Sequence, residues 1–300
     1  MFTDWSINEH QQTNTNVMPL TFDGDINAAV DEALAWSSMF DHHPTLNELW
    51  RDLRRPCSEE TLVQHLDQRA DLLVDAGYVH VVDGMRHPLE HHRRLLAKQH
   101  LDHTAEVLGI LASCSAVTGL AVTGSIAAGK NDEDGDVDVL LVTKPGWVWR
   151  TRALALYLAH RHPNGARLCP NMLLAEGNLA IEPSLYGARE LMRMIPLKDT
   201  SGLSQLHAAN AWAQDALPNA SMKPQIHVPI TTDYPWWWRI MTLPLVGRIV
   251  ERWEASRRIK QLMAATSTTE AVYSRSVCRG HENAHKQRIE RRYRQHGGDV

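Results

Sequence analysis

Residues 122–142 read Val122-Thr-Gly-Ser-Ile-Ala-Ala-Gly-Lys-Asn-Asp-Glu-Asp-Gly-Asp-Val-Asp-Val-Leu-Leu-Val142. Aliphatic residues at both ends of this stretch predict two strands, one over 120–123 that leads into Gly124-Ser125 and one over 137–142. Successive side chains of a strand alternate between its faces, so Asp136 and Asp138 are expected to share one face. The stretch therefore predicts a pair of carboxylates beside a glycine-serine turn.

Such a pair favours a metal and phosphate chemistry. Two ionised carboxylates a few ångströms apart repel each other unless a cation lies between them. Mg²⁺ prefers oxygen ligands and usually keeps substrate phosphates and water as further partners. Glycine lets the backbone approach a phosphate closely, and a serine hydroxyl with nearby N–H groups holds phosphate oxygens. We expect Asp136 and Asp138 to be catalytic Mg²⁺ ligands, and Gly124 and Ser125 to bind a nucleotide.

This order of features resembles the signature of the DNA polymerase β nucleotidyltransferase superfamily: a strand, Gly-Ser, a short polar connection and a strand with Asp-x-Asp. The wider chain resembles its bacterial members with an N-terminal winged helix, over roughly residues 40–220 and more faintly in the C-terminal helices. Three segments carry that wider likeness: Cys169-Pro-Asn171, Leu185-Tyr-Gly-Ala-Arg-Glu190 and Ala216-Leu-Pro-Asn219.

The resemblance implies transfer of a nucleoside monophosphate from an NTP, expected to be ATP, with release of pyrophosphate and Mg²⁺ as cofactor. The acceptor stays open among proteins, RNA and small molecules. The alternative is a non-catalytic winged-helix regulatory or nucleotide-binding protein with a degenerate transferase core.

The family often has a third carboxylate on the following strand, here predicted over 168–174, and this chain has Asn171 at its centre. Asn can coordinate Mg²⁺ through its carbonyl but cannot act as a general base. Glu182, which closes a short strand predicted over 179–181, is the candidate third catalytic acid. Whether Glu182 or Asn171 completes the site stays open.

The chain divides into four expected parts: a disordered tail (1–20), a winged-helix domain (21–87), the nucleotidyltransferase core (88–220) and a C-terminal helical region (221–300). The expected fold class is α/β (α+β), with a mixed sheet in the core. Further predicted helices span 26–40, 88–113, 147–160, 185–195, 203–216, 236–263 and 270–295.

The predicted winged helix has three helices and a β hairpin. Thr45-Leu-Asn-Glu48 forms a capping box, and Ser58 caps a third helix that runs through residues 72–74 and ends at Gly77. A strand over 78–82 and an Asp83-Gly84 turn complete the hairpin. The third helix is acidic, which disfavours contact with DNA phosphates, so DNA binding is an alternative and packing is preferred.

Two other motifs are weaker. Residues 124–131 nearly match the P-loop, but Asn131 stands where Ser or Thr binds Mg²⁺ and a strand follows in place of a helix. His281-Glu-Asn-Ala-His285 matches the zinc-protease motif H-E-x-x-H, but Arg288 and Arg291 stand where its longer form needs Gly and His. We interpret both matches as chance.

Composition is that of a globular protein, with 43% hydrophobic residues and a net charge of −4. The charge is uneven, because residues 239–300 hold 13 Lys and Arg against 6 Asp and Glu. Trp236-Trp-Trp238 heads a basic helix, which suits a membrane surface but more often indicates docking on the core. Four scattered cysteines, no signal peptide and no long apolar run predict a cytoplasmic protein without a transmembrane segment.

Overall fold

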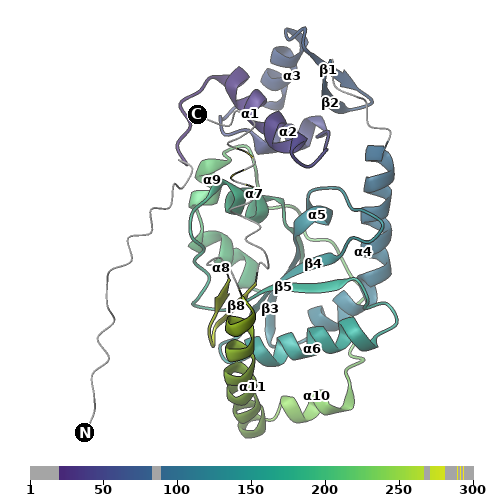
Figure 1. The fold of residues 1–300 in the computed structure, drawn as a ribbon, viewed down its shortest axis with the longest axis vertical. Helices are drawn as coiled ribbons and strands as arrows, with labels where there is room; N and C mark the ends of the chain where they lie inside the picture. The colour runs from purple at the N-terminus through teal and green to yellow at the C-terminus, as the bar shows by residue number, and fades with distance from the viewer. Residues whose placement is uncertain are drawn as a thin grey trace, which may run out of the picture.

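The computed structural model describes residues 20–82, 89–266 and 271–280, together with Ile289, Arg291 and Tyr293. It joins a mixed sheet covered by helices to a smaller helical unit with a β hairpin (Figure 1). The expected mixed α+β class is therefore confirmed. The tail predicted over 1–20, apart from Leu20, and the H-E-x-x-H segment lie outside the described residues.

The N-terminal unit contains α1 (Ile26–Ser38), α2 (Leu46–Asp52), α3 (Glu59–Asp67) and a hairpin of β1 (Leu72–Asp75) with β2 (Tyr78–Val81). The capping box forms as expected, because the Glu48 N–H donates to Thr45 Oγ1 and the Thr45 N–H donates to the Glu48 carboxylate. Ser58 caps α3 through the Thr61 N–H. The order of three helices and a hairpin agrees with a winged helix, which stays a prediction.

The third helix is shorter than predicted. It ends at Asp67, and residues 72–75 form β1 instead. Ala76 and Gly77 both have positive φ, 50° and 83°, which is the backbone of a two-residue type I′ hairpin turn. Gly77 therefore turns a hairpin and does not end a helix, while Asp83-Gly84 lies outside the described residues.

The large sheet has the strand order β6-β3-β4-β5-β8-β7. β4 and β5 are parallel, and the other neighbours are antiparallel. The strands are β3 (Val117–Val122), β4 (Val137–Thr143), β5 (Leu168–Ala175), β6 (Ile195–Asp199), β7 (Val272–Tyr273) and β8 (Val277–Arg279). The helix predicted over 270–295 is wrong at its start, where β7 and β8 form an edge hairpin.

The strand predicted over 179–181 and the single helix predicted over 203–216 are both wrong, and Asn210 explains both. Its amide donates to Leu179 O and accepts from the Ile181 N–H, at 2.8 Å each, so this segment bonds to a side chain and not to a strand. The same amide donates to Leu206 O in the last turn of α8 (Gly202–Ala209). The predicted helix ends there, and α9 (Trp212–Ala216) begins two residues after Asn210.

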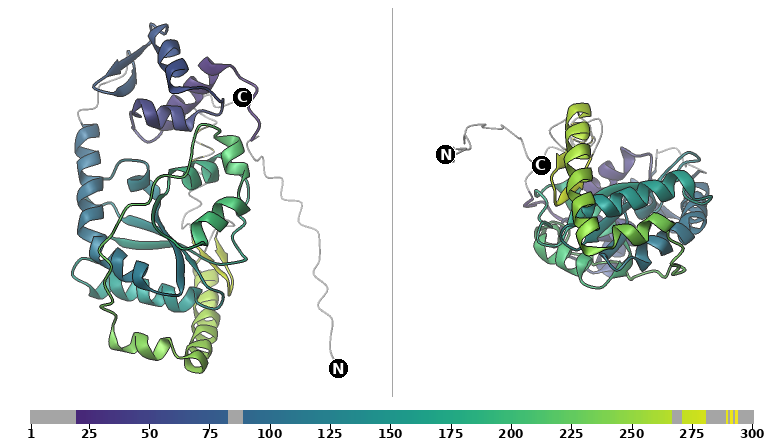
Figure 2. Two further views of the ribbon diagram at one scale, coloured as in Figure 1. Left: turned by 180° about the vertical axis from the view of Figure 1, so that it is seen from behind. Right: turned by 90° about the horizontal axis from the view of Figure 1, so that it is seen from below.

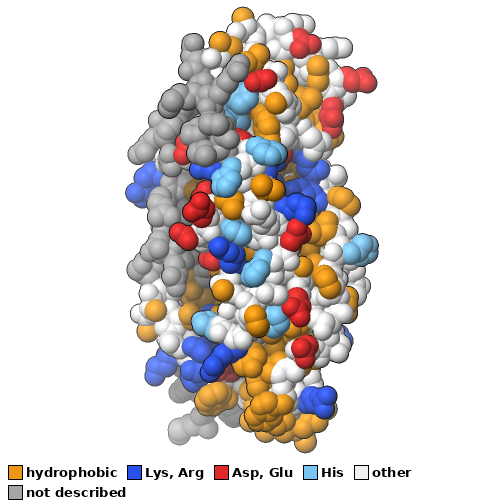
Figure 3. Space-filling model, turned by 90° about the vertical axis from the view of Figure 1, so that its right-hand side faces the viewer, with side chains coloured by type: hydrophobic (Ala, Val, Ile, Leu, Met, Phe, Trp, Pro, Cys, Tyr) orange, Lys and Arg blue, Asp and Glu red, His pale blue; other side chains and the backbone are white. Residues whose placement is uncertain are grey.

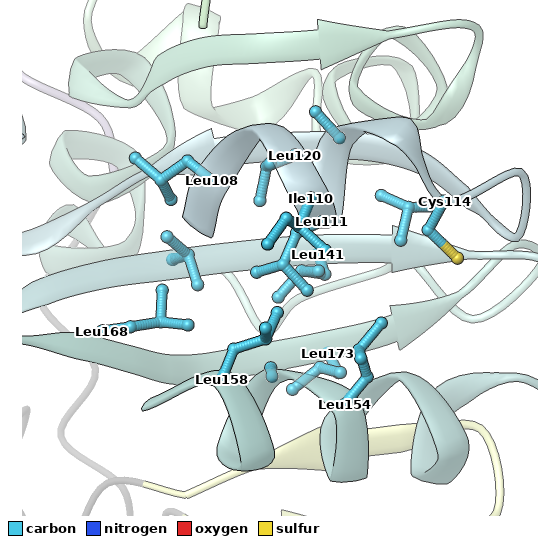
Figure 4. Close-up of a cluster of buried hydrophobic side chains, with 14 of the residues drawn as sticks. Leu108, Ile110, Leu111, Cys114, Leu120, Leu141, Leu154, Leu158, Leu168 and Leu173 are labelled. Carbon is cyan, nitrogen blue, oxygen red and sulfur yellow. The ribbon is translucent and has the colours of Figure 1, made fainter. Parts of the chain in front are cut away.

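Side chains of β4 alternate between two hydrophobic layers. Val137, Val139 and Leu141 pack towards α4 (Leu89–Ser113) and α6 (Val148–Arg161), in the cluster drawn in Figure 4. Leu140 and Val142 pack towards α7 (Leu185–Arg193), α8 and α9. Asp138 follows the second set, so the sheet presents it to the α7 side.

The C-terminal helices α10 (Trp236–Met241) and α11 (Pro244–Ala265) lie at the end of the molecule away from the N-terminal unit (Figure 2). α11 packs on α6. The helix predicted over 236–263 is interrupted between α10 and α11, where Pro244 begins the second helix. None of the helices in the described part of the chain has the length and apolar character of a membrane span.

A buried ion pair ties the N-terminal unit to the core. Arg189 Nη2 of α7 lies 3.2 Å from Glu32 Oε1 of α1, and the two side chains are 1% and 2% exposed. Tyr293 donates its hydroxyl proton to the same Glu32 oxygen at 2.8 Å, and Trp36 lies under the guanidinium. The buried charges of Arg189 and Glu32 therefore neutralise each other, and Tyr293 adds a hydrogen bond to the carboxylate.

Glu32→Gln is expected to lower the free energy of unfolding by about 3–5 kcal/mol, because it leaves the Arg189 charge buried without a counter-ion. The measurement is urea unfolding. Asp31→Asn is the matched control on the same helix: Asp31 is 57% exposed in its pair with Arg69, so a loss below about 1 kcal/mol is expected. Equal losses for the two variants would contradict this account of the ion pair.

Candidate functional site

The turn after β3 lies directly on Asp138. Gly124 has φ +65° and begins the one-turn helix α5 (Gly124–Ala127). A Cβ atom on Gly124 would come within 2.4 Å of Asp138 Oδ2, so both the backbone angle and the contact require glycine. The Thr123 N–H donates to Asp138 O at 2.9 Å and fixes the turn to β4.

The two predicted metal ligands come together at the start of β4. Asp136 immediately precedes the strand and is exposed, while Asp138 is half-buried within it. Burial, followed by the negative charge of Asp136, raises the pKa of Asp138 above its usual range. Neither aspartate has a cationic partner among the described residues. The pair is therefore electrostatically uncompensated, as a cation site requires.

A neutral thiol lies opposite Asp138 on the next strand. The parallel register pairs Asp138 with Cys169, and the Cys169 thiol donates to the Asp138 carboxylate. Burial and the Asp138 charge raise the pKa of Cys169 to about 12, so the thiol stays protonated. Asn171 lies at a bulge, where the register shifts between Pro170 and Met172. From the sequence, Asn171 was expected to stand at the place of the family's third carboxylate on a regular strand, and the bulge was not predicted.

A third carboxylate reaches the turn from α7. The Gly124 N–H donates to the carboxylate of Glu190, and burial together with the Asp138 charge raises the pKa of Glu190. Sequence reasoning assigned Glu190 no chemical role, although it closes the segment 185–190 that carried the family resemblance. Glu182, the acid that the sequence favoured, is exposed on the segment between β5 and α7.

Asn131 organises the loop between the turn and β4. Its buried amide accepts from Ser125 Oγ at 3.1 Å and lies 2.9 Å from His100 Nδ1. Gly135 is needed here, because a Cβ atom would lie 1.8 Å from Asn131 Oδ1. The residue at the last position of the P-loop match is thus a loop anchor. Only one helical turn follows Gly124, which agrees with the rejection of a P-loop.

A cavity of about 160 Å³ lies beside α5, where the N-terminal unit meets the core. Arg51, Arg193 and Lys223 bring positive charge to its wall, against Glu48 and Asp52. Its other lining residues are His42, Pro44, Thr45, Asn47, Ala127 and Ala128.

Two of the cavity cations bind mainly to the main chain. Arg51 donates to Met192 O and Ser221 O, and Lys223 donates to Ala127 O of α5 at 2.8 Å. Burial, and then the neighbouring charges of Arg51 and Arg193, lower the pKa of Lys223 to about 8. Arg193 pairs with Asp52. The cavity wall therefore carries more positive than negative charge, which suits an anionic ligand.

A metal ion at this site would depend on its substrate. Within the described ranges, no group of three or more His, Cys, Asp or Glu side chains is arranged to hold a metal ion. Mg²⁺ fits such a site, because it is usually bound by one or two carboxylates with phosphates and water as the other ligands. The donor set of Asp136 and Asp138 matches this requirement.

Residues 105–158 match the family model described as nucleotidyltransferase domain. The matched segment runs from the second half of α4 through β3, α5 and β4 into α6, and so contains the Gly124 turn and both aspartates. This part of the chain is thus similar to a nucleotidyltransferase domain, a type of domain that generally uses a divalent metal. No curated protein and no solved structure matched the chain.

Proposed function

We propose that this protein is a Mg²⁺-dependent nucleotidyltransferase that transfers a nucleoside monophosphate from an NTP, with ATP as the first candidate, and releases pyrophosphate. The observation that carries the proposal is the contact of the Gly124 turn with Asp138, beside Asp136 and without a neutralising cation. The nucleotidyltransferase match over the same residues supports it.

Each part of the site has a task in this reaction. Asp136 and Asp138 would hold Mg²⁺, which would offset the negative charge of the phosphates during the transfer. Ser125 and the N–H groups of the turn bind the triphosphate. As the acceptor hydroxyl oxygen bonds to the α-phosphorus, the bond from that phosphorus to the bridging oxygen breaks. Pyrophosphate leaves with the electron pair, and the hydroxyl proton passes to water.

Glu190 is proposed as the third acid of the site, in a positioning role. It holds the Gly124 N–H and places a further negative charge near Asp138, which favours a cation there. Glu182 is the rival from the sequence. Its exposed position on a connecting segment gives it less support than Glu190.

The acceptor side is proposed to include the cavity between α2, α5 and the end of α7. Arg193 lies three residues beyond Glu190 on α7, and the charges of these two side chains influence each other's pKa. Arg193 therefore links the cation-lined cavity wall electrostatically to the acidic site. Its cations suit an acceptor with an anionic group.

The charges on the third helix, α3, do not favour the alternative of a DNA-binding regulator. Arg69, just beyond α3, is paired with both Asp31 and Asp71. Glu59, Glu60 and Asp67 on α3 are exposed. This surface would repel phosphates, and it lacks the positive charge that non-specific DNA contact requires.

Incubation of the full chain with α-labelled NTPs, Mg²⁺ and protein, tRNA or small-molecule acceptors tests the proposal. Label is expected on one acceptor class, together with released pyrophosphate, and is expected to disappear in the double variant Asp136→Ala, Asp138→Ala. Transfer that persists in the double variant would refute the assigned chemistry. Absence of both transfer and NTP binding by calorimetry would refute the function.

A further inference from the structure

The outer side of α10 and α11 exposes an apolar stripe. Leu245, Ile249 and Trp253 follow one another at four-residue spacing on α11, and they are 75%, 68% and 62% exposed. Residues at this spacing lie on one helix face. Trp236, at the start of α10, is 77% exposed, although Trp238 is buried. The predicted docking of the tryptophans on the core thus holds for Trp238 and leaves Trp236 in solvent.

The helices α10 and α11 themselves carry no exposed acid, and the nearest exposed one before them in the sequence is Asp233. Between residues 236 and 257 the acidic residues are Glu251 and Glu254, and both are buried. Glu251 accepts from the Trp149 and Arg150 N–H groups of α6, and Glu254 pairs with Arg257 and Arg258.

The exposed charges on α10 and α11 are all positive. Arg239, Arg248 and Arg252 are exposed, and none of them pairs with a carboxylate of a described residue. Figure 3 shows hydrophobic side chains gathered at the end of the molecule where α10 lies, with Lys and Arg side chains around them. The surface is therefore apolar and cationic together.

The fold fixes the direction in which this surface points. Gly247 of α11 faces Arg150 of α6, and a Cβ atom there would lie 2.1 Å from Arg150 Nη1 and 2.3 Å from Met241 O. Arg150 also donates to Met241 O and stacks on Trp147. Because the inner side of α11 is fitted so closely to α6, the exposed stripe is a fixed feature of the structure.

We propose that the α10–α11 surface binds a bilayer that contains anionic phospholipids. This surface is formed by Trp236, Arg239, Leu243, Leu245, Arg248, Ile249, Arg252 and Trp253. Aliphatic and tryptophan side chains enter the boundary between headgroups and acyl chains, and arginines meet the lipid phosphates. This inference is independent of the proposed nucleotide transfer.

Two other partners fit the same surface less well. A nucleic acid would use the arginines but offers no apolar layer for Leu245 and Ile249. A second copy of the chain, paired through the same surface by a two-fold axis, would bring arginines against arginines. An anionic bilayer satisfies both the charge and the apolar side chains.

Co-sedimentation of the full chain with phosphatidylcholine vesicles, with or without phosphatidylglycerol, tests the proposal. Wild type is expected to bind the anionic vesicles, to bind neutral ones at least tenfold more weakly, and to release as salt rises. The double variant Arg248→Gln, Arg252→Gln is expected to lose roughly tenfold or more in affinity, since each cation near an anionic surface adds about a factor of five.

A second pair of variants separates the apolar contribution from charge. Leu245→Ser with Ile249→Ser is expected to weaken vesicle binding at least tenfold. Leu73→Ser with Val74→Ser, which removes exposed apolar side chains from β1, is expected to leave it unchanged. Circular dichroism and size-exclusion chromatography check the fold and the oligomeric state of each variant.

Any of three results would overturn the proposal. Wild type could bind neutral and anionic vesicles equally, or it could bind neither. The third result is a Leu245→Ser, Ile249→Ser protein that binds vesicles as wild type does. If that variant instead turns a dimer into a monomer and wild type ignores vesicles, the surface belongs to a second copy.

Discussion

Asp138→Asn is expected to reduce nucleotide transfer at least about 10³-fold. The side chain lies under the Gly124 turn and supplies one of two proposed Mg²⁺ ligands. Charge stabilisation by a metal contributes several kcal/mol to such a reaction, and each 1.4 kcal/mol is a factor of ten in rate. Asparagine keeps the shape of the side chain but removes its charge. The measurement is kcat/KM for the labelled NTP at saturating Mg²⁺.

The same substitution is expected to stabilise the protein at neutral pH. Burial and Asp136 raise the pKa of Asp138, so its ionised form opposes folding, and the loss of stability begins as pH rises above the usual aspartate range. The gain in Tm for Asp138→Asn should therefore shrink as pH falls towards 4, where wild type also becomes neutral. A variant that is both inactive and less stable would indicate a damaged fold instead.

Asp134→Asn is the matched control for this prediction. Asp134 is exposed in the same loop, two residues before Asp136. It is expected to retain transfer within about twofold of wild type, because a screened charge at the surface contributes little. A comparable loss in Asp134→Asn would show that loop charge in general, and not the Asp138 position, governs the rate.

Glu190→Gln is expected to weaken Mg²⁺ binding and nucleotide transfer by about 10- to 100-fold, the usual cost of losing an outer partner of a metal site. Glutamine can still accept the Gly124 N–H, so the turn should persist while the charge near Asp138 is lost. Calorimetric titration with Mn²⁺ gives the metal affinity apart from activity.

Glu182→Gln separates the two candidates for the third acid. If Glu190 has the role, Glu182→Gln should bind Mn²⁺ as wild type does, because its side chain is exposed between β5 and α7. If Glu182 has the role, Glu182→Gln should lose Mn²⁺ affinity and Glu190→Gln should keep it. Full Mn²⁺ affinity in Glu190→Gln would exclude Glu190 from the site.

Local signals in the sequence predict the backbone around Gly124 and Asp138 well. The aliphatic run around Asp138 is a strand, and the glycine that must turn onto it is Gly124, because hydrophobic periodicity and backbone freedom are properties of a few neighbouring residues. The capping box at Thr45 is predicted for the same reason. Each of these features depends on contacts within a short stretch of chain.

Features that depend on distant contacts are not predicted. Glu190 meets a turn that is 66 residues earlier in the chain, and no spacing rule connects α7 with Gly124. β8 pairs with the far edge of β5, which turns a segment with helical composition into a strand. Residues 179–181 are β-like in sequence, but the Asn210 side chain takes their hydrogen bonds. Tertiary partners decide these cases.

Binding of Mn²⁺ in the presence of a non-hydrolysable NTP analogue, followed by electron paramagnetic resonance, tests the central claim most directly. Wild type is expected to bind Mn²⁺ more tightly with the nucleotide than without it. The double variant Asp136→Asn, Asp138→Asn is expected to lose at least about 100-fold in affinity, since it removes both proposed metal ligands. Equal Mn²⁺ affinity in wild type and the double variant would contradict a metal and nucleotide site at this turn.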